Sequence, residues 1–351
     1  SRYDNADGGT SFINPFYISR MIAPIYPVHL HDASGALVLD ANGQPQYDFG
    51  DGRPFASGRH TIFENLNDRQ NQVRGAIGAR TFGSIHILPG LKATAKLSFD
   101  FQDTQDRTFD NPLVGDGAPS GRAYQYLYRT TSYTFSQLAE YNKKFDKHNL
   151  QVLAGHENYS YKYNYLSGSR SGIIVDGITE LVNFATVLGT SSYEDNATIE
   201  SYLSRVSYDY DSKYLFSGSF RRDGNSKFSP AVRWANFWSL SGGWNINREA
   251  FFKASWVDQL KLRTSYGVLG NDGGLGYYPY QALYDLGRNN QAEAGIIQRS
   301  LANPELTWET SKNFDVGVDF SLFGGRLGGS VEYFKRKTDG LIFQVQQPLS
   351  I

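Results

Sequence analysis

The sequence of 351 residues has no cysteine at all. This absence excludes a disulfide framework, a cysteine-based zinc site and a thiol nucleophile. An excess of one charge is also lacking, because 34 Lys and Arg residues balance 35 Asp and Glu residues. No basic field therefore favours nucleic acid as a partner. An apolar stretch near 21–30 is interrupted by Pro24 and Pro27, and no run approaches the roughly 18 residues that a membrane helix needs.

Motifs for covalent chemistry are missing too. The sequence contains no nucleophile elbow, no phosphate-binding loop and no HExxH motif, and its 6 His residues are scattered. His29 and His31 could present two ligands to a metal from one strand face, but the favoured interpretation is two polar residues beside a proline-rich turn. We therefore expect no enzyme, no cofactor and no metal site.

What the sequence does contain is alternation with a period of two. In the clearest stretch, apolar residues occupy one parity: Leu91, Ala93, Ala95, Leu97, Phe99 and Phe101. Polar residues occupy the other parity: Lys92, Thr94, Lys96, Ser98 and Asp100. This period places the two sets on opposite faces of a β-strand.

Ten such stretches recur, and the gaps between them alternate between short and long. The predicted strands cover about 72–88, 91–103, 133–145, 149–165, 202–210, 214–222, 238–246, 260–268, 313–322 and 326–338. The predicted long loops are 104–131, a second loop that ends at Asn196, and 270–303, whereas residues 1–70 have no lasting period and are expected to be irregular. One helical turn could form within 247–258.

This pattern predicts an all-β protein: a transmembrane antiparallel β-barrel wall with long extracellular loops and short periplasmic turns. A soluble sandwich or propeller is the alternative. Strands of 12 or more residues argue against it, since soluble strands average about 5–6. Aromatic residues near strand ends, such as Tyr208, Tyr210 and Trp308, suit lipid interfaces. The apolar parity, including Val316 and Val318, is expected to face lipid.

Several segments resemble the SusC/RagA family of TonB-dependent outer-membrane transporters. They occur in the family's order along nearly the whole chain. These segments are NPFY (14–17), APIYPV (23–28), FRRDGNSKF (220–228), LKLRTSYGVLGN (260–271), NPELTWE (303–309), FDVGVDF (314–320) and RLGGSVEY (326–333).

The resemblance implies a barrel of about 22 strands, of which this chain would supply about ten. Residues 1–70 would be an extracellular loop region that enters the barrel, and 71–346 its strands and loops. The plug domain, the TonB box and the last strands would lie outside this sequence, so we expect it to be part of a longer protein.

The resemblance also implies a function. Such a protein would import oligosaccharides, other glycans or peptides across a bacterial outer membrane as a multi-pass protein in contact with lipid and lipopolysaccharide. Its partners would be a SusD-like surface lipoprotein and the TonB–ExbB–ExbD complex. The alternatives are a passive porin and a surface binding protein without energy coupling.

Two groups of tyrosines in the predicted loops are candidate substrate-binding residues. They are Tyr124, Tyr126 and Tyr128, and Tyr277, Tyr278 and Tyr280. Their rings could stack on sugars or hold a peptide, or they could pack the loops together or against the lipoprotein. On the polar parity, charged residues could line a path or pair with one another and with the plug: Lys92, Lys96, Arg205, Arg263, Asp315 and Asp319.

Overall fold

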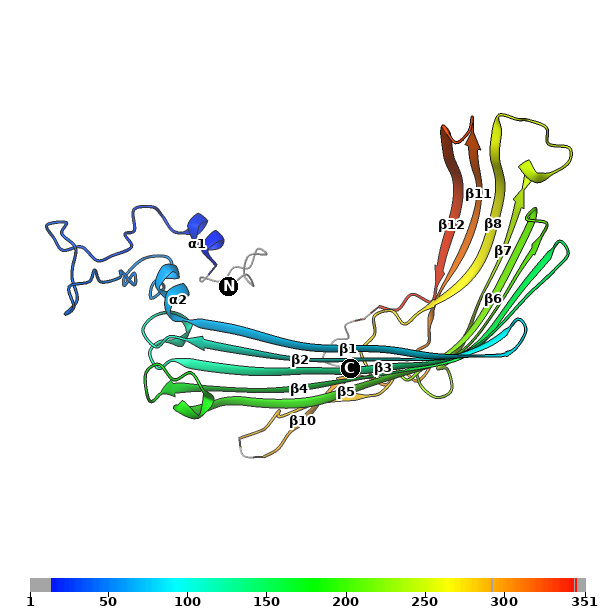
Figure 1. The fold of residues 1–351 in the computed structure, drawn as a ribbon. Coiled ribbons are helices and arrows are strands. Elements are labelled where there is room, and N and C mark those ends of the chain that lie inside the picture. The colour runs from blue at the N-terminus through cyan, green and yellow to red at the C-terminus, as the bar shows by residue number, and fades with distance from the viewer. Residues whose placement is uncertain (1–13, 292, 344, 346–351) are drawn as a thin grey trace. The chain divides into compact units, whose positions relative to one another are not determined.

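The computed structural model describes residues 14–291, 293–343 and 345, and its main feature is one ten-stranded sheet (Figure 1). Sequence neighbours are sheet neighbours, in the order β1-β2-β3-β4-β5-β6-β7-β8-β11-β12. The strands are β1 (Arg69–Leu88), β2 (Leu91–Asp110), β3 (Arg122–Phe145), β4 (His148–Ile173), β5 (Phe184–Tyr210), β6 (Tyr214–Asn225), β7 (Trp234–Asn245), β8 (Val257–Asn271), β11 (Glu309–Leu322) and β12 (Leu327–Asp339). The predicted all-β class with ten long strands is confirmed.

The chain divides into two compact units. The first is drawn from Ser1–Ile77, Phe101–Thr130 and Tyr163–Glu194, and the second from Gly78–Asp100, Thr131–Lys162 and Asp195–Ile351. Strands β1 to β5 contribute residues to both units, whereas β6 to β12 belong to the second unit alone.

In the second unit, the antiparallel register separates two faces. Val318 lies opposite Leu262 on β8 and Val331 on β12, so apolar side chains form a continuous row across three strands. The next row places Gly317 opposite Arg263 and Glu332. These pairings confirm the predicted separation of the parities.

The apolar face of this unit is widely exposed. Leu240 is 48% exposed and Val331 is 69% exposed, and both share the parity of Val318 through the paired strands. An apolar face that continues over several strands requires an apolar environment.

The long loops are shorter than predicted, because the strands continue past the expected ends. The β2–β3 connection is only 111–121, and the β4–β5 connection is 174–183. The expected loop 104–131 and the expected loop that ends at Asn196 were therefore wrong at both ends. The extra strand segments pair polar or tyrosine-rich faces, so they lack the apolar–polar contrast from which the strands were predicted.

The prediction of irregular structure for 1–70 is confirmed for 22–60, which contain turns and isolated β-bridges, but it missed two short helices. Residues 1–13 lie outside the described residues. Helix α1 (Pro15–Met21) begins after Asn14, whose side chain accepts hydrogen bonds from the first turn. Helix α2 (Thr61–Asn67) begins after His60. Neither helix of the described chain has the length and apolar character needed to cross a membrane.

The connection 272–308 contains a short hairpin that the sequence analysis missed. Strands β9 (Leu283–Leu286) and β10 (Ile296–Ser300) form a separate two-stranded antiparallel sheet. Both are short, and their exposed apolar residues give no clear period.

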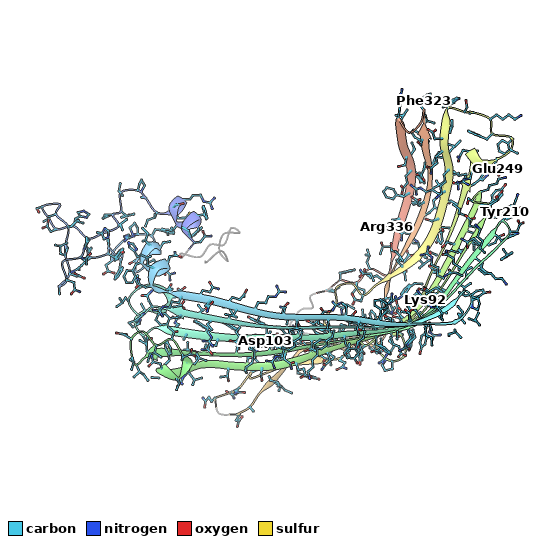
Figure 2. All side chains as sticks on the ribbon, in the orientation of Figure 1. Lys92, Asp103, Tyr210, Glu249, Phe323 and Arg336 are labelled. Atoms are coloured by element: carbon cyan, nitrogen blue, oxygen red, sulfur yellow. The ribbon has the colours of Figure 1, made fainter. Side chains whose placement is uncertain are left out.

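The short turns agree with the prediction, and the β7–β8 connection covers 246–256, close to the expected 247–258. The expected helical turn in this connection is a 3-10 helix, η3 (Ile246–Arg248). Tyr210 is the last residue of β5, Phe323 directly follows β11, and Glu249 directly follows η3 (Figure 2).

Candidate functional site

Tyr124, Tyr126 and Tyr128 lie on strand β3 rather than in a loop. The rings of Tyr124 and Tyr126 have centroids 6.4 Å apart with 2° between their planes. The rings of Tyr126 and Tyr128 are 6.2 Å apart at 16°. Alternate residues of a strand share one face, so the three rings form a row along β3.

Three further tyrosines continue this row across two more strands. Tyr128 contacts Tyr165 on β4 at 5.5 Å, and Tyr165 contacts Tyr193 on β5 at 4.9 Å. Tyr163 also contacts Tyr193, at 5.9 Å. The tyrosine surface of the first unit therefore consists of Tyr124, Tyr126, Tyr128, Tyr163, Tyr165 and Tyr193. Tyr163 and Tyr165 were missed, although the alternating tyrosines of 159–165 were visible in the sequence.

The opposite face of the same segment carries charged and amide pairs. Arg129, next to Tyr128, donates to Asp103 at 2.9 Å, and Gln125 donates to Glu180 at 2.9 Å. Glu180 also pairs with Arg107 at 3.0 Å. A cavity of about 380 Å³ adjoins these pairs, and its lining includes Arg107 and Gln125 as well as Tyr126. Neither face here has the apolar composition that lipid contact requires.

The tyrosine surface has the polar parity of β3. Along this uninterrupted strand, Tyr128 and Glu140 are both even-numbered, so their side chains leave the same face. Glu140 pairs with Lys92 at 3.0 Å, and Lys92 belongs to the polar parity of β2. The tyrosines therefore do not form a belt on the apolar face.

The second group of candidate tyrosines packs a loop within the second unit. The ring of Tyr277 lies parallel to that of Tyr161 on β4, at 5.9 Å and 5°. The hydroxyl of Tyr278 accepts a hydrogen bond from the backbone N–H of Asn196 at 3.1 Å. Burial is the main cause that raises the pKa of Tyr277. These contacts favour a role in loop packing for Tyr277 and Tyr278.

Tyr280 lies further along the same loop. Its backbone carbonyl accepts a hydrogen bond from the N–H of Asn303, and its hydroxyl accepts one from Gln281. The candidate tyrosines therefore belong to two groups, with Tyr124, Tyr126 and Tyr128 in the first unit and Tyr277, Tyr278 and Tyr280 in the second.

A small buried core joins two loops of the second unit. Phe228 is fully buried, and its ring lies 5.1 Å from that of Trp308. Phe237 packs on the same indole at 5.3 Å, and the indole N–H donates to the carbonyl of Arg233. Trp308, which was expected at a lipid interface, packs here on Phe228 and Phe237. The segments FRRDGNSKF and NPELTWE meet in this core.

Charged side chains on the polar face of the second unit are paired. Arg263 contacts Asp315 at 2.8 Å, Asp319 at 3.3 Å and Glu332 at 2.8 Å. Its guanidinium lies across Gly317, where a Cβ atom would come within 2.9 Å of it. Four of the six charged residues singled out in the sequence thus form ion pairs: Lys92, Arg263, Asp315 and Asp319.

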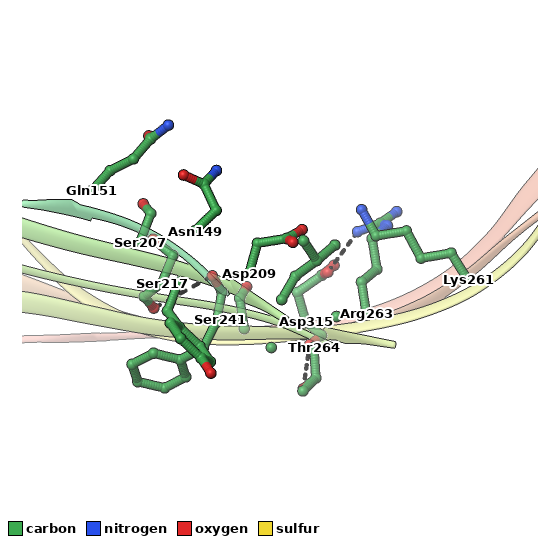
Figure 3. A pocket seen from close by; sticks show the side chains of 16 residues that line it. Asn149, Gln151, Ser207, Asp209, Ser217, Ser241, Lys261, Arg263, Thr264 and Asp315 are labelled. Atoms are coloured by element: carbon green, nitrogen blue, oxygen red, sulfur yellow. Dashed lines mark hydrogen bonds and ion pairs between the residues drawn. The ribbon is translucent and has the colours of Figure 1, made fainter. Parts of the chain in front are cut away.

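A cavity of about 480 Å³ adjoins this cluster. Figure 3 shows Asn149, Asp209 and Arg263 on one side of the strands, whereas Thr264 points to the other side. The polar wall of the cavity offers amide, hydroxyl and carboxylate groups, which suit water or a polar ligand rather than lipid.

Within residues 14–291, 293–343 and 345, no group of three or more His, Asp or Glu side chains could hold a metal ion. The backbone of His29 forms an isolated antiparallel β-bridge with that of Tyr47, and the centroids of their rings lie 5.0 Å apart. His31 forms its own bridge to Leu37. Both histidines thus take part in the loop structure that precedes α2.

Comparison with known proteins identifies relatives of this wall. The family described as "TonB dependent receptor-like, beta-barrel" matches residues 25–350. The TonB-dependent receptor P3 of Formosa agariphila is 34% identical over 277 residues, which cover 76% of this chain and 27% of that protein. The TonB-dependent receptor SusC of Bacteroides thetaiotaomicron is 28% identical over 296 residues, covering 82% of this chain and 29% of SusC.

A solved structure shows the same fold. A chain in the "Structure of the RagAB peptide transporter" aligns with a TM-score of 0.79 and 26% identity, covering 88% of this chain and 35% of that one. The chain thus spans about 27% to 29% of the length of these curated relatives. The family matches residues 25–350, and the ten-stranded sheet has the two faces of a barrel wall. The chain therefore belongs to the TonB-dependent receptor-like β-barrel family.

Proposed function

We propose that this chain forms part of the wall of an energy-coupled outer-membrane importer. The observation that carries the proposal is the two-faced sheet together with its family membership. The apolar face, with Leu262, Val318 and Val331, would meet lipid, and the face with Arg263 would line the interior. In hydrocarbon, only a closed barrel satisfies every backbone N–H and C=O of such strands, so other strands would complete the wall.

The two ends of the strands would face different compartments. The long connections 111–121, 174–183, 226–233 and 272–308 would be extracellular, and the short turns periplasmic. Residues 1–70 would be an extracellular region that enters the barrel, and 71–346 would supply its strands and loops. The outer surface would contact membrane lipid and lipopolysaccharide.

Energy coupling would require parts of the protein outside these residues. The TonB–ExbB–ExbD complex would act through a plug domain and an N-terminal TonB-binding segment. A SusD-like surface lipoprotein would cover the extracellular loops. In this proposal the protein moves its substrate without covalent chemistry, because the described residues offer ion pairs and aromatic surfaces rather than a convergent acid, base and nucleophile.

The substrate would be an oligosaccharide or a peptide, with the oligosaccharide preferred. SusC is a named relative, and the RagAB structure is described as a peptide transporter. Tyr124, Tyr126 and Tyr128 would contact a substrate through their rings. Taken by themselves, Tyr277, Tyr278 and Tyr280 would either do the same or hold their own loop in place.

An uptake experiment tests the importer. Cells with the full-length gene would be given labelled oligosaccharides and peptides, with and without an intact TonB gene. We expect uptake to fall to the background level without TonB. Uptake that persists would indicate a passive porin, and surface binding without uptake would indicate a binding protein. Release of a chemically cleaved product by the purified protein would contradict the proposal by revealing an enzyme.

A further inference from the structure

We propose that three lysines on the apolar face of the second unit bind a phosphate group of a glycolipid in the outer leaflet of the membrane. This lysine cluster consists of Lys312 on β11 and of Lys335 and Lys337 on β12. The inference rests on the proposed orientation of the wall in the outer membrane. It goes beyond general contact with lipid by assigning one site and one headgroup chemistry.

The lysine cluster lies on the apolar face of the sheet. Along β12, Lys335 and Lys337 share the parity of Val331. Lys337 lies opposite Lys312 in the antiparallel register, and Lys335 lies opposite Phe314. All three lysines are exposed. Their ammonium groups are therefore on the side of the wall that would meet lipid, and not on the polar face with its ion pairs.

The cluster also lies where the apolar part of the strands ends. Every second residue of β11 from Phe314 to Leu322 is apolar. This run covers roughly 26 Å at about 3.3 Å per residue, which is the scale of the ~25 Å apolar band of a membrane barrel. Lys312 is the next residue of this parity, on the side of the long connection 272–308. A charge near this boundary costs far less than one at the middle of the bilayer, so the lysines would lie at the depth of the extracellular headgroups.

The charges within the cluster do not balance. Asp339 pairs with Lys312 at 2.9 Å and with Lys337 at 3.0 Å, whereas Lys335 makes no ion pair with a described residue. Three lysines and one aspartate leave two positive charges in excess. Lys312 and Lys337 face each other directly, and like charges in this position repel. An anion would relieve the repulsion, and the Lys337 side chain is 69% exposed to one.

This excess charge matches a phosphate monoester on an acylated lipid. A phosphate monoester carries about −1.5 to −2 charges near pH 7, more than the phosphodiester of an ordinary phospholipid, and lysine binds phosphate as a compact point charge. Tyr333 and Val331 continue the parity of Lys335 away from the long connection, and they are 61% and 69% exposed. They offer an apolar surface to acyl chains. An extracellular lipid with acyl chains and phosphate monoesters is lipid A, the glycolipid anchor of lipopolysaccharide.

The test uses the full-length protein with its lipoprotein partner in detergent. Native mass spectrometry would measure the binding of lipid A with its phosphates intact, lipid A with its phosphates removed, and phosphatidylglycerol. The variants are Lys335→Gln, Lys337→Gln and Asp339→Asn. Arg336→Gln is the matched control, because Arg336 lies between the two lysines on β12 but has the opposite parity and donates to Asn313 at 2.9 Å. Resistance of the barrel to protease verifies that each variant is folded.

We expect phosphorylated lipid A to bind more tightly than the dephosphorylated form and than phosphatidylglycerol. Each lysine variant should weaken its binding about three- to tenfold, which is the contribution of one basic residue beside an anionic lipid surface. Asp339→Asn should tighten the binding, because it removes a negative charge beside the phosphate. Arg336→Gln should leave it unchanged.

Lipid A binding that neither lysine variant weakens would overturn the inference. This result is also expected if a carboxylate of a neighbouring strand already neutralises the cluster. An equal loss in Arg336→Gln would overturn it too, and so would phosphatidylglycerol that binds as tightly as phosphorylated lipid A. Failure of the importer itself would instead appear as uptake independent of TonB, which is measured separately from lipid binding.

Discussion

Two parts of the same sheet combine the same strand geometry with different side chains on their faces. In the second unit, the row of Leu262, Val318 and Val331 backs onto the polar row of Arg263 and Glu332. In the first unit, the tyrosine surface backs onto ion-paired side chains such as Arg129 and Asp103. The comparison teaches that a period of two indicates a strand, whereas only the apolar–polar contrast between its faces indicates lipid on one side.

The difference between the two kinds of face can be tested most directly by introducing a charged side chain on each of them. Val318→Lys, near the centre of the apolar residues of β11, should lower the free energy of unfolding by about 2–4 kcal/mol. Leu166→Lys, on the ion-paired face of β4, should change it by no more than about 0.5 kcal/mol, because Leu166 is already 54% exposed. Denaturant titration of the full-length barrel in lipid vesicles measures both. Equal costs would mean that the apolar face of β11 does not meet lipid.

Strand ends beside the buried core of Phe228, Phe237 and Trp308 should tolerate added side-chain volume much less than exposed positions of the sheet. A Cβ atom at Gly270 would overlap the ring of Phe237, whereas at Gly83 it would have no neighbour within 4 Å. Gly270→Ala should therefore cost about 1–3 kcal/mol through overpacking, and Gly83→Ala should be close to neutral. Thermal unfolding of both variants tests this difference. A neutral Gly270→Ala would show that Phe237 can move without loosening Trp308.

The sequence predicted most of the sheet because the contrast between an apolar and a polar face is a local pattern with a period of two. For β11, alternation over 313–322 indicated the strand and its two faces, and the structure extends it only to Glu309. The buried core of Phe228, Phe237 and Trp308 could not be predicted in the same way. It depends on Trp308 meeting a loop 75 residues earlier in the sequence, and no local period records that contact. Extended strand segments such as 122–131 were missed because both of their faces carry polar or tyrosine side chains.

For the candidate site, residue type was a better guide than location. Tyr124, Tyr126 and Tyr128 were identified as aromatic residues, yet they were placed in a loop because glycine and proline are frequent just before them. The actual breakers are confined to 111–121. Tyr193 could not be linked to them from sequence, since that requires the pairing of β4 with β5.

Ion pairs on the non-tyrosine face of the first unit should contribute little. The Arg129 side chain is 47% exposed and the Asp103 side chain 22% exposed, so water screens their attraction. Arg129→Ala should lower the free energy of unfolding by less than about 1 kcal/mol. Repeating the measurement in high salt gives the control, because the native protein should then lose most of its advantage over the variant. A larger, salt-independent cost would indicate that Arg129 acts through packing on Phe101.

The smallest expected effect concerns a buried carboxyl in the first unit. Glu64 on α2 is almost fully buried, accepts a hydrogen bond from the His60 backbone N–H and pairs with Arg59 at 2.9 Å. Burial raises its pKa above the ordinary value of 4.5, and these two partners oppose the rise. The folded form therefore holds a proton more tightly than an opened form. Protection of α2 against opening should grow as pH falls through the raised pKa, and the gain should be complete below the ordinary value.

Hydrogen exchange of the α2 amides in the full-length protein, at about pH 7 and about pH 5, measures this gain. The Glu64→Gln variant cannot take up a proton at this site, so native protection relative to the variant should be greater at the lower pH. His60 has a pKa lowered mainly by burial, and its protonation would weaken the cap that it gives to Phe63. The variant retains His60, so this opposite effect cancels in the ratio. If the protection of the native protein relative to the variant falls with acidification, Arg59 and the His60 backbone N–H outweigh burial and hold Glu64 charged.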